Sequence, residues 1–335
     1  MQYKTLGRTG VKVSPLCLGA MMFGGEADAA TAAEVVARAL DAGINFIDTA
    51  NAYHRGRSEE VLGGILAADG RRSKIVLATK VFNRMSDDPN DAGLSRRHVI
   101  EQCEASLRRL RTDYIDLYQL HRPSLTVPID ETLRALDDLV RAGKVRYLGT
   151  STFAAWQIVE GLWASKDYGL NRFVCEQPPY NILDRRVERE VLPMAATFGL
   201  GVIPWGPLAG GLLTGKYRRG EPAPVGTRYG DLAPGDFRLK RYVGAAFDVV
   251  DALAPLARAK GCTLSQFALA WVAQQPHVSS AIIGPRRVDQ LVDNLGALQV
   301  KIDDEDRRAV DAVVPPGEVV VSHYNTEPGP HRHRI

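Results

Sequence analysis

The chain has 335 residues, of which 45% are hydrophobic and 24% are charged, the balance of an ordinary globular protein. Its net charge of +3 is too small to predict a nucleic-acid-binding protein, and no basic run is interleaved with aromatic residues. The four cysteines lie far apart and form no C-x-x-C pair, so they predict neither a disulfide framework nor a zinc site.

The N-terminal residues lack the charged and apolar regions of a signal peptide. No apolar run approaches the roughly 20 residues that a membrane-spanning helix needs. Together with cysteines that suit a reducing compartment, these features predict a soluble, cytoplasmic protein with no membrane partner and no metal site.

Strand-like and helix-like patterns alternate along the whole chain. Short apolar runs predict strands at 16–19, 44–47, 75–79, 115–120, 145–148, 173–175, 201–204 and 280–283. Helical patterns cover 31–42, 58–68, 95–110, 130–142, 153–163, 186–198, 244–260, 264–274, 288–298 and 304–313. Ser95 is a candidate helix N-cap, and Gly43 and Gly143 are candidate helix stops.

Eight strands, each followed by a helical pattern, predict an α/β fold, a (β/α)₈ TIM barrel forming a single domain over residues 1–335. We also expect an N-terminal β-hairpin and extra C-terminal helices. A doubly wound sheet is the alternative, but no G-x-G-x-x-G fingerprint follows the first strand. The tail from His331 to Arg334 is predicted to be disordered, and a metal site there is not favoured.

Polar residues follow three successive predicted strands. Asp48 ends the first of these runs, with Tyr53 five residues later, Lys80 ends the second, and His121 ends the third. The carboxyl ends of parallel strands meet at one rim of a barrel. A lysine that ends a buried run needs a partner, and Asp48 is the natural one.

Each of these residues has an ordinary structural interpretation. Asp48 with Thr49 is typical of a turn cap, Tyr53 of a rim tyrosine and His121 of a hydrogen-bonded strand-end histidine. Asp48 and Lys80 together could be a structural ion pair. The recurrence of polar groups at successive strand ends favours a functional site.

The set Asp48, Tyr53, Lys80 and His121 resembles the catalytic tetrad of the aldo-keto reductases. The branch it resembles most contains bacterial aryl-alcohol-dehydrogenase-like and potassium-channel-β-subunit-like proteins. The resemblance runs from about Tyr3 to about Val313 and is carried further by the segments 6–10, 13–19, 176–181 and 205–217.

This resemblance implies an NADPH-dependent oxidoreductase, of the NADP-linked alcohol dehydrogenase type, that reduces aldehydes or ketones to alcohols. The hydride has to come from a bound nicotinamide, since no side chain supplies one. Tyr53 would be the proton donor, and the Lys80 ammonium, held by Asp48, would favour the phenolate that proton transfer leaves. His121 would orient the carbonyl and share in proton donation.

The last predicted strand is followed by Gly284, Pro285, Arg286 and Arg287, which open a helix. Two cations at a helix N-terminus oppose the helix dipole, which favours a bound anion between them and the backbone N–H groups. A solvated basic helix start is the alternative. The resemblance implies that the anion is the 2′-phosphate of NADP(H), bound by Arg286 rather than Arg287.

The resemblance also implies the other cofactor contacts. Trp205 would stack on the nicotinamide, although a packing role in the barrel is the alternative, and Ser151 and Gln177 would bind its carboxamide. The remaining implied contacts are Met21, Asp48, Gly206, Pro207, Leu208, Gly210, Lys216, Gly284, Gln290, Asp293 and Asn294. Two positions depart from the family pattern, Thr152 where asparagine is usual and Gly206 where serine is frequent.

Two features of the sequence suggest functions other than a reductase. The stretch from Gly210 to Lys216 reads G-x-x-x-x-G-K, but Tyr217 follows where a nucleotide triphosphatase needs Ser or Thr. An NADP-binding, redox-sensing regulatory subunit with slow turnover is the stronger rival, and the complete tetrad favours the enzyme over it.

The substrate is expected to be a small carbonyl compound. Its identity depends on the loops at 82–93, 122–128 and 217–241, and the oligomeric state stays open, with a homo-oligomer among the alternatives. Trp156 and Trp163, on a predicted helix, are expected to be packing residues rather than substrate contacts.

Overall fold

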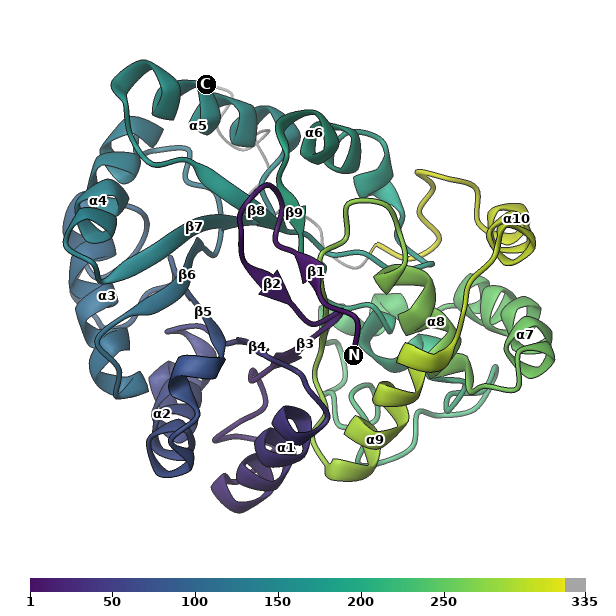
Figure 1. The fold of residues 1–335 in the computed structure, drawn as a ribbon. Helices are drawn as coiled ribbons and strands as arrows, with labels where there is room; N and C mark the ends of the chain where they lie inside the picture. Colours follow the sequence, from purple (N-terminus) through teal and green to yellow (C-terminus); the bar gives the residue numbers. More distant parts are fainter. Residues whose placement is uncertain (323–335) are drawn as a thin grey trace.

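Eight parallel strands curl into a barrel in the computed structural model, which describes residues 1–322 (Figure 1). Their hydrogen-bonded order is β10-β3-β4-β5-β6-β7-β8-β9. The strands are β3 (Leu16–Gly19), β4 (Phe46–Asp48), β5 (Val76–Val81), β6 (Ile115–Leu120), β7 (Val145–Ser151), β8 (Phe173–Gln177), β9 (Gly201–Val202) and β10 (Ala281–Ile283).

The ring closes between β9 and β10. The Ser279 amide donates to the Val202 carbonyl at 2.8 Å, and the Ile282 amide donates to the Pro204 carbonyl at 2.9 Å. The predicted (β/α)₈ barrel is therefore confirmed. The predicted tail at His331–Arg334 lies outside the described residues.

Helices form an outer layer around the strands (Figure 1). The α-helices are α1 (Ala29–Asp41), α2 (Arg57–Asp69), α3 (Arg96–Leu110), α4 (Ile129–Arg141), α5 (Ala155–Tyr168), α6 (Val191–Phe198), α7 (Gly244–Ala259), α8 (Leu264–Ala273), α9 (Val288–Gly296) and α10 (Asp304–Val313). Short 3₁₀ turns are η1 (Tyr53–Gly56), η2 (Arg72–Lys74), η3 (Arg186–Glu188), η4 (Ala209–Thr214), η5 (Phe237–Arg241) and η6 (Ala297–Gln299). The predicted extra C-terminal helices are present, and α7 and α10 lie side by side.

The helix ends follow the expected capping residues. The Ser95 hydroxyl accepts a hydrogen bond from the His98 amide at 3.3 Å at the start of α3. Gly43 and Gly143, which follow α1 and α4, have φ of +89° and +73°, a conformation that glycine adopts without strain.

The single helix predicted at 186–198 is wrong, because the structure divides it into η3 and α6. Pro193 lies in the first turn of α6. It has no N–H to donate, and its ring clashes with the carbonyl four residues earlier, so a continuous helix cannot run back through this position.

The predicted N-terminal hairpin is also confirmed. β1 (Lys4–Thr5) pairs antiparallel with β2 (Lys12–Val13), and Figure 1 shows this hairpin lying across the ring of strands. Its Leu6 and Val13 are fully buried against the apolar interior of the barrel, which is formed by Cys17, Phe46, Ala78, Leu117, Cys175, Ile203 and Ile282. The amino-terminal end of the barrel is therefore closed by apolar side chains.

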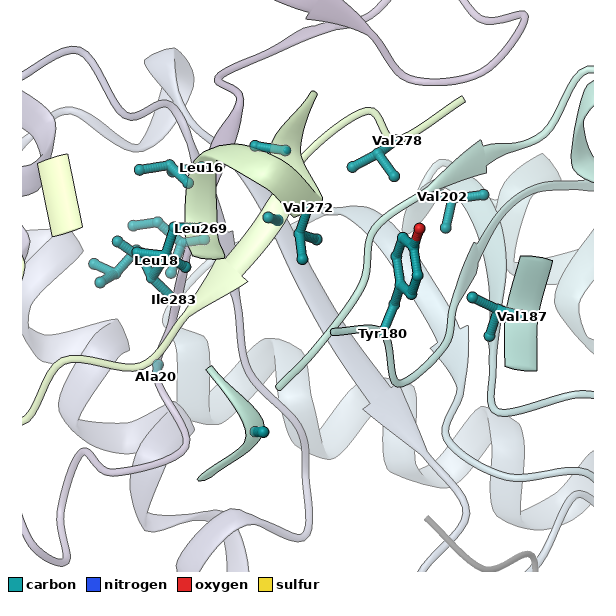
Figure 2. Close-up of a cluster of buried hydrophobic side chains, with 14 of the residues drawn as sticks. Leu16, Leu18, Ala20, Tyr180, Val187, Val202, Leu269, Val272, Val278 and Ile283 are labelled. Atoms are coloured by element: carbon teal, nitrogen blue, oxygen red, sulfur yellow. The ribbon is translucent and has the colours of Figure 1, made fainter. Parts of the chain in front are cut away.

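A second, larger core lies between the strands and the helices. Figure 2 shows Leu16, Leu18 and Ile283 from the strands beside Leu269 of α8. The side chains of Leu16 and Leu18 face outward and that of Cys17 faces inward, as the period of two along a strand requires.

One packing expectation is wrong. Trp156 and Trp163 of α5 are 52% and 64% exposed. They lie seven residues apart and so share a helix face, and that face of α5 points to solvent.

Candidate active site

The alternation along three strands carries polar side chains into the barrel above the apolar layer. Asp48 follows the inward-facing Phe46 by two residues in β4, and Lys80 follows Ala78 by two in β5. Successive residues of a strand point to opposite faces, so residues two apart share one. The polar layer therefore lies at the carboxyl ends of the strands, opposite the hairpin.

Lys80 is the centre of this layer. Its side chain is fully buried, and its ammonium donates to Asp48 Oδ1 at 2.5 Å, to the Thr49 carbonyl at 2.8 Å and to Tyr53 Oη at 3.2 Å. Burial alone would lower the pKa of Lys80, but Asp48 and Tyr53 outweigh it and raise that pKa above its ordinary value. Lys80 therefore stays charged beside the tyrosine hydroxyl.

The second carboxylate oxygen of Asp48 is held by two amides. Gln119 Nε2 donates to Oδ2 at 3.0 Å, and Gln177 Nε2 donates to the same atom at 2.9 Å. Gln119 was not among the predicted site residues. Gln119 lies in β6, two residues before His121, which follows the strand. This spacing could have identified Gln119, because residues two apart face the same side of a strand.

Tyr53 is the first residue of a strained turn, η1. The two residues after it, His54 and Arg55, have φ of +47° and +55°, and Gly56 has φ of +93°. Positive φ at non-glycine residues is costly and is kept where the surroundings enforce it. Here His54 Nε2 lies 3.3 Å from a carboxylate oxygen of Glu26, which ties the turn to the loop after β3.

His121 stands beside Tyr53. Their ring centroids are 5.6 Å apart and the rings are nearly perpendicular. Burial, and then the positive charges of Lys80 and Arg122, lower the pKa of His121 well below its ordinary value. The imidazole is therefore neutral at neutral pH and has one N–H to donate.

A cavity of about 520 Å³ opens over this layer. All fifteen residues predicted to contact the cofactor line it, as do Tyr53 and His121, while Lys80 lies behind them. The structure also places here several residues that the sequence did not predict, among them Met22, Arg122, Gly211, Arg228, Ser265 and Leu269. The 217–241 loop supplies Arg228, whose place in the cavity no local pattern indicates.

One end of the cavity is strongly cationic. Burial lowers the pKa of Lys216, and the neighbouring Arg286, Arg287 and Arg228 lower it further. Burial also lowers the pKa of Arg228. Like charges gathered at one place are stabilised by a bound anion, so this end of the cavity suits phosphate groups.

The two arginines that precede α9 differ in their surroundings. Arg287 makes a bidentate ion pair with Asp289, with both N–O distances 2.9 Å. Arg286 is half-buried, its amide donates to Gln290 Oε1 at 2.8 Å, and its guanidinium reaches the Gly226 carbonyl at 3.4 Å. Arg286 thus joins the helix start to the 217–241 loop over the cavity.

The two positions that depart from the family pattern both have a positive φ. Thr152 has φ of +60°, where the usual asparagine is better tolerated than a β-branched residue. Gly206 has φ of +68°, a conformation that a serine would adopt only with strain. The Ser151 hydroxyl donates to the Gln177 carbonyl at 2.9 Å.

The stretch that resembles a triphosphatase loop has a different setting. Gly210 and Gly211 belong to η4, with φ of +68° and +101°, and the next α-helix begins only at Gly244. The loop of a nucleotide triphosphatase leads directly into a helix.

Comparison with known proteins agrees with this geometry. The model of the "Aldo/keto reductase family" matches residues 15–315. The chain is 41% identical to a "Probable voltage-gated potassium channel subunit beta" of Oryza sativa subsp. japonica over 303 residues, covering 90% of this chain and 92% of that protein. It is also 41% identical to the "Uncharacterized oxidoreductase YrpG" of Bacillus subtilis (strain 168) over 324 residues, covering 94% and 96%.

A more distant relative is a "Putative voltage-gated potassium channel subunit beta" of Schizosaccharomyces pombe, 37% identical over 322 residues with 93% of each chain covered. These relatives confirm the branch that the sequence motifs resembled.

Proposed function

Because this chain belongs to the aldo/keto reductase family, we propose that it reduces aldehydes or ketones to alcohols with NADPH as the hydride donor. The observation that carries the proposal is the buried Lys80 ammonium, bonded to Asp48 and 3.2 Å from the hydroxyl of Tyr53 at the cavity wall. That arrangement stabilises the phenolate that a proton donor leaves behind.

Each side chain has a part in carbonyl reduction. When bound, the nicotinamide supplies the hydride that adds to the carbonyl carbon, and it is thereby oxidised. Tyr53 donates its hydroxyl proton to the carbonyl oxygen as the π electron pair moves onto that oxygen, and Lys80 stabilises the phenolate. Asp48 and its two glutamine partners hold Lys80 in place.

His121 has the role of orienting the carbonyl. A neutral imidazole donates one hydrogen bond but is a poor acid, and its low pKa therefore favours orientation over a share in proton donation. The solvent returns a proton to Tyr53 after the alcohol leaves.

The walls of the cavity suit NADPH. We assign Lys216, Arg228 and Arg286 to its phosphates, since these cations lie together at one end. We assign Ser151, Gln177 and Trp205, which line the cavity with Tyr53, to the nicotinamide. Asp293 and Asn294 of α9 would then lie on the adenine side.

The test is consumption of NADPH with a panel of aromatic and aliphatic aldehydes, for the wild type and Tyr53→Phe. We expect the variant to lose at least about 100-fold in kcat, because it keeps the ring and loses the proton. NADPH affinity, measured by cofactor fluorescence, should stay within about threefold. An equal loss of turnover and of NADPH affinity would contradict the assignment of Tyr53.

A regulatory subunit that senses redox state is the second candidate, favoured by the similarity to proteins named as potassium channel β subunits. Such a protein would hold NADP tightly and turn over slowly. Repeated turnovers with exchange of NADP would support the enzyme. A stoichiometric burst followed by no further reaction would support the sensor.

The proposal includes a single domain and a cytoplasmic location. All four cysteines lie in the described residues and are unpaired, which suits a reducing compartment. No helix of residues 1–322 is long and apolar enough to cross a membrane.

A further inference from the structure

Arg122 is a cation of the cavity wall that the mechanism above does not use. It follows His121 at the end of β6 and lines the same cavity as Tyr53. Its charge contributes to the low pKa of His121, so it acts at the end of the cavity where the carbonyl reacts.

The topology separates Arg122 from the phosphate-binding cations. In the ring order β10-β3-β4-β5-β6-β7-β8-β9, four steps lead from β10 to β6 in either direction. Arg286 follows β10, and Lys216 and Arg228 follow the neighbouring β9. Arg122 therefore stands across the barrel rim from them and belongs to the substrate side.

The guanidinium is held in a defined direction. Arg122 Nη1 donates to Thr152 Oγ1 at 2.9 Å, and this hydroxyl donates in turn to the Ser151 carbonyl at 2.6 Å. Thr152 keeps the strained φ of +60° in this arrangement. A preorganised guanidinium binds a carboxylate or phosphate in a bidentate way with little loss of side-chain freedom.

The carboxyl group behind this wall does not compete for the guanidinium at neutral pH. Glu176 is fully buried, accepts a hydrogen bond from the Phe153 amide at 3.2 Å, and lies within electrostatic reach of Arg122. Burial raises the pKa of Glu176 to about 8, so it is protonated and uncharged below that pH.

We propose that Arg122 is an anion subsite of the substrate pocket, and that the preferred substrates are carbonyl compounds that carry a carboxylate or phosphate group. This inference rests on the proposed reductase function and adds the substrate class. Carboxylate and phosphate groups both offer oxyanions to the guanidinium, and this group of the substrate would lie at the end of the cavity away from the cofactor phosphates.

The experiment compares 4-carboxybenzaldehyde with its methyl ester, which keeps the ring and aldehyde and lacks the charge. We expect the wild type to have a kcat/KM at least about tenfold higher for the acid. Arg122→Met should lower kcat/KM for the acid by about 10- to 100-fold, mainly through KM, and should lower kcat/KM for the ester by a clearly smaller factor. Arg122→Lys should recover part of the preference.

Arg108→Met is the matched control, because Arg108 is an exposed arginine of α3 outside the cavity wall, and both substrates should be unaffected. If the wild type reduced both aldehydes equally well, or if Arg122→Met lowered both alike, this inference would be overturned while the reductase function stood. Turnover of neither of these two aldehydes, with turnover of others in the panel, would overturn this inference alone, and turnover of no aldehyde at all would overturn both.

A second pair of substrates separates the two sources of the anion. Succinic semialdehyde offers a carboxylate, and glyceraldehyde 3-phosphate offers a phosphate. The compound whose kcat/KM falls more in Arg122→Met shows whether the subsite binds a carboxylate or a phosphate. If kcat/KM falls for neither compound, the subsite is contradicted.

Discussion

Lys80 and Glu176 are both fully buried at the same rim of the barrel, yet Lys80 is charged and Glu176 is uncharged at neutral pH. Lys80 has a carboxylate at 2.5 Å, which outweighs the penalty of burial and keeps the ammonium charged. Glu176 Oε1 accepts a hydrogen bond from the Phe153 amide at 3.2 Å, and Thr150 and Thr152 also lower the pKa of Glu176, but among the described residues nothing bonds to its Oε2. Burial therefore dominates and keeps Glu176 protonated.

Glu176 makes the stability of the protein depend on pH. Its pKa is about 8 in the folded chain and 4.5 in the reference state, so between these values the folded chain holds a proton that the unfolded chain has lost. The free energy of unfolding therefore falls as pH rises from 4.5 to 8, and the loss is complete above 8.

Glu176→Gln should remove this dependence, because the amide has the shape of the protonated carboxyl and does not titrate. We expect the variant to gain stability relative to the wild type as pH rises, by on the order of a few kcal/mol above pH 8. Urea unfolding at pH 5, 7 and 9 measures the difference. A difference that is the same at all three pH values would show that Glu176 does not titrate in this way.

At the scale of elements, close packing of α2 on α3 depends on one glycine. A Cβ added to Gly63 would lie 2.2 Å from the Arg109 carbonyl oxygen and 2.7 Å from Leu110 backbone atoms. The backbone of α3 cannot move aside as a flexible side chain does. The adjacent Gly64, on the same helix, has open space where its Cβ would be.

These neighbours form a matched pair. Gly63→Ala should destabilise the protein by about 1–3 kcal/mol, because α2 and α3 have to separate. Gly64→Ala should stabilise it by about 0.5–1 kcal/mol, because alanine favours a helix interior. Unfolding midpoints in urea measure both changes, and equal effects of the two substitutions would refute the packing argument.

At the scale of the whole molecule, segments far apart in the chain form the cationic end of the cavity, which we assign to the cofactor phosphates. Lys216 follows η4, Arg228 belongs to the 217–241 loop, and Arg286 comes after β10. The hydrogen bond from Arg286 to the Gly226 carbonyl joins two of these segments. The proposed preference for NADPH would therefore depend on contacts that only the assembled barrel makes.

Arg286→Ala should therefore weaken NADPH binding far more than NADH binding, since only NADPH has the 2′-phosphate. We expect the Kd of NADPH to rise by about 10- to 100-fold and that of NADH to change by less than about threefold. Arg287→Ala is the control, because Arg287 is paired with Asp289 and exposed. If Arg287→Ala had the larger effect, or if the NADPH to NADH ratio did not change, the 2′-phosphate site would lie elsewhere.

The barrel, and the placement of several polar residues at its carboxyl rim, could be predicted from the sequence. The alternation of strand and helix patterns predicted the eight strands, and polar residues at strand ends identified Asp48, Lys80 and His121. These features are local, since a strand's period of two and its end follow from neighbouring residues. Gln119 was within reach of the same reasoning.

The side chains that surround this rim depend on tertiary contacts. The place of Arg228 depends on how the 217–241 loop folds back over η4, and the direction of Arg122 depends on a hydroxyl 30 residues away. The exposure of Trp156 and Trp163 likewise depends on how α5 turns against β8. Contacts between distant segments set all three, and periodicity along the chain carries no information about such contacts.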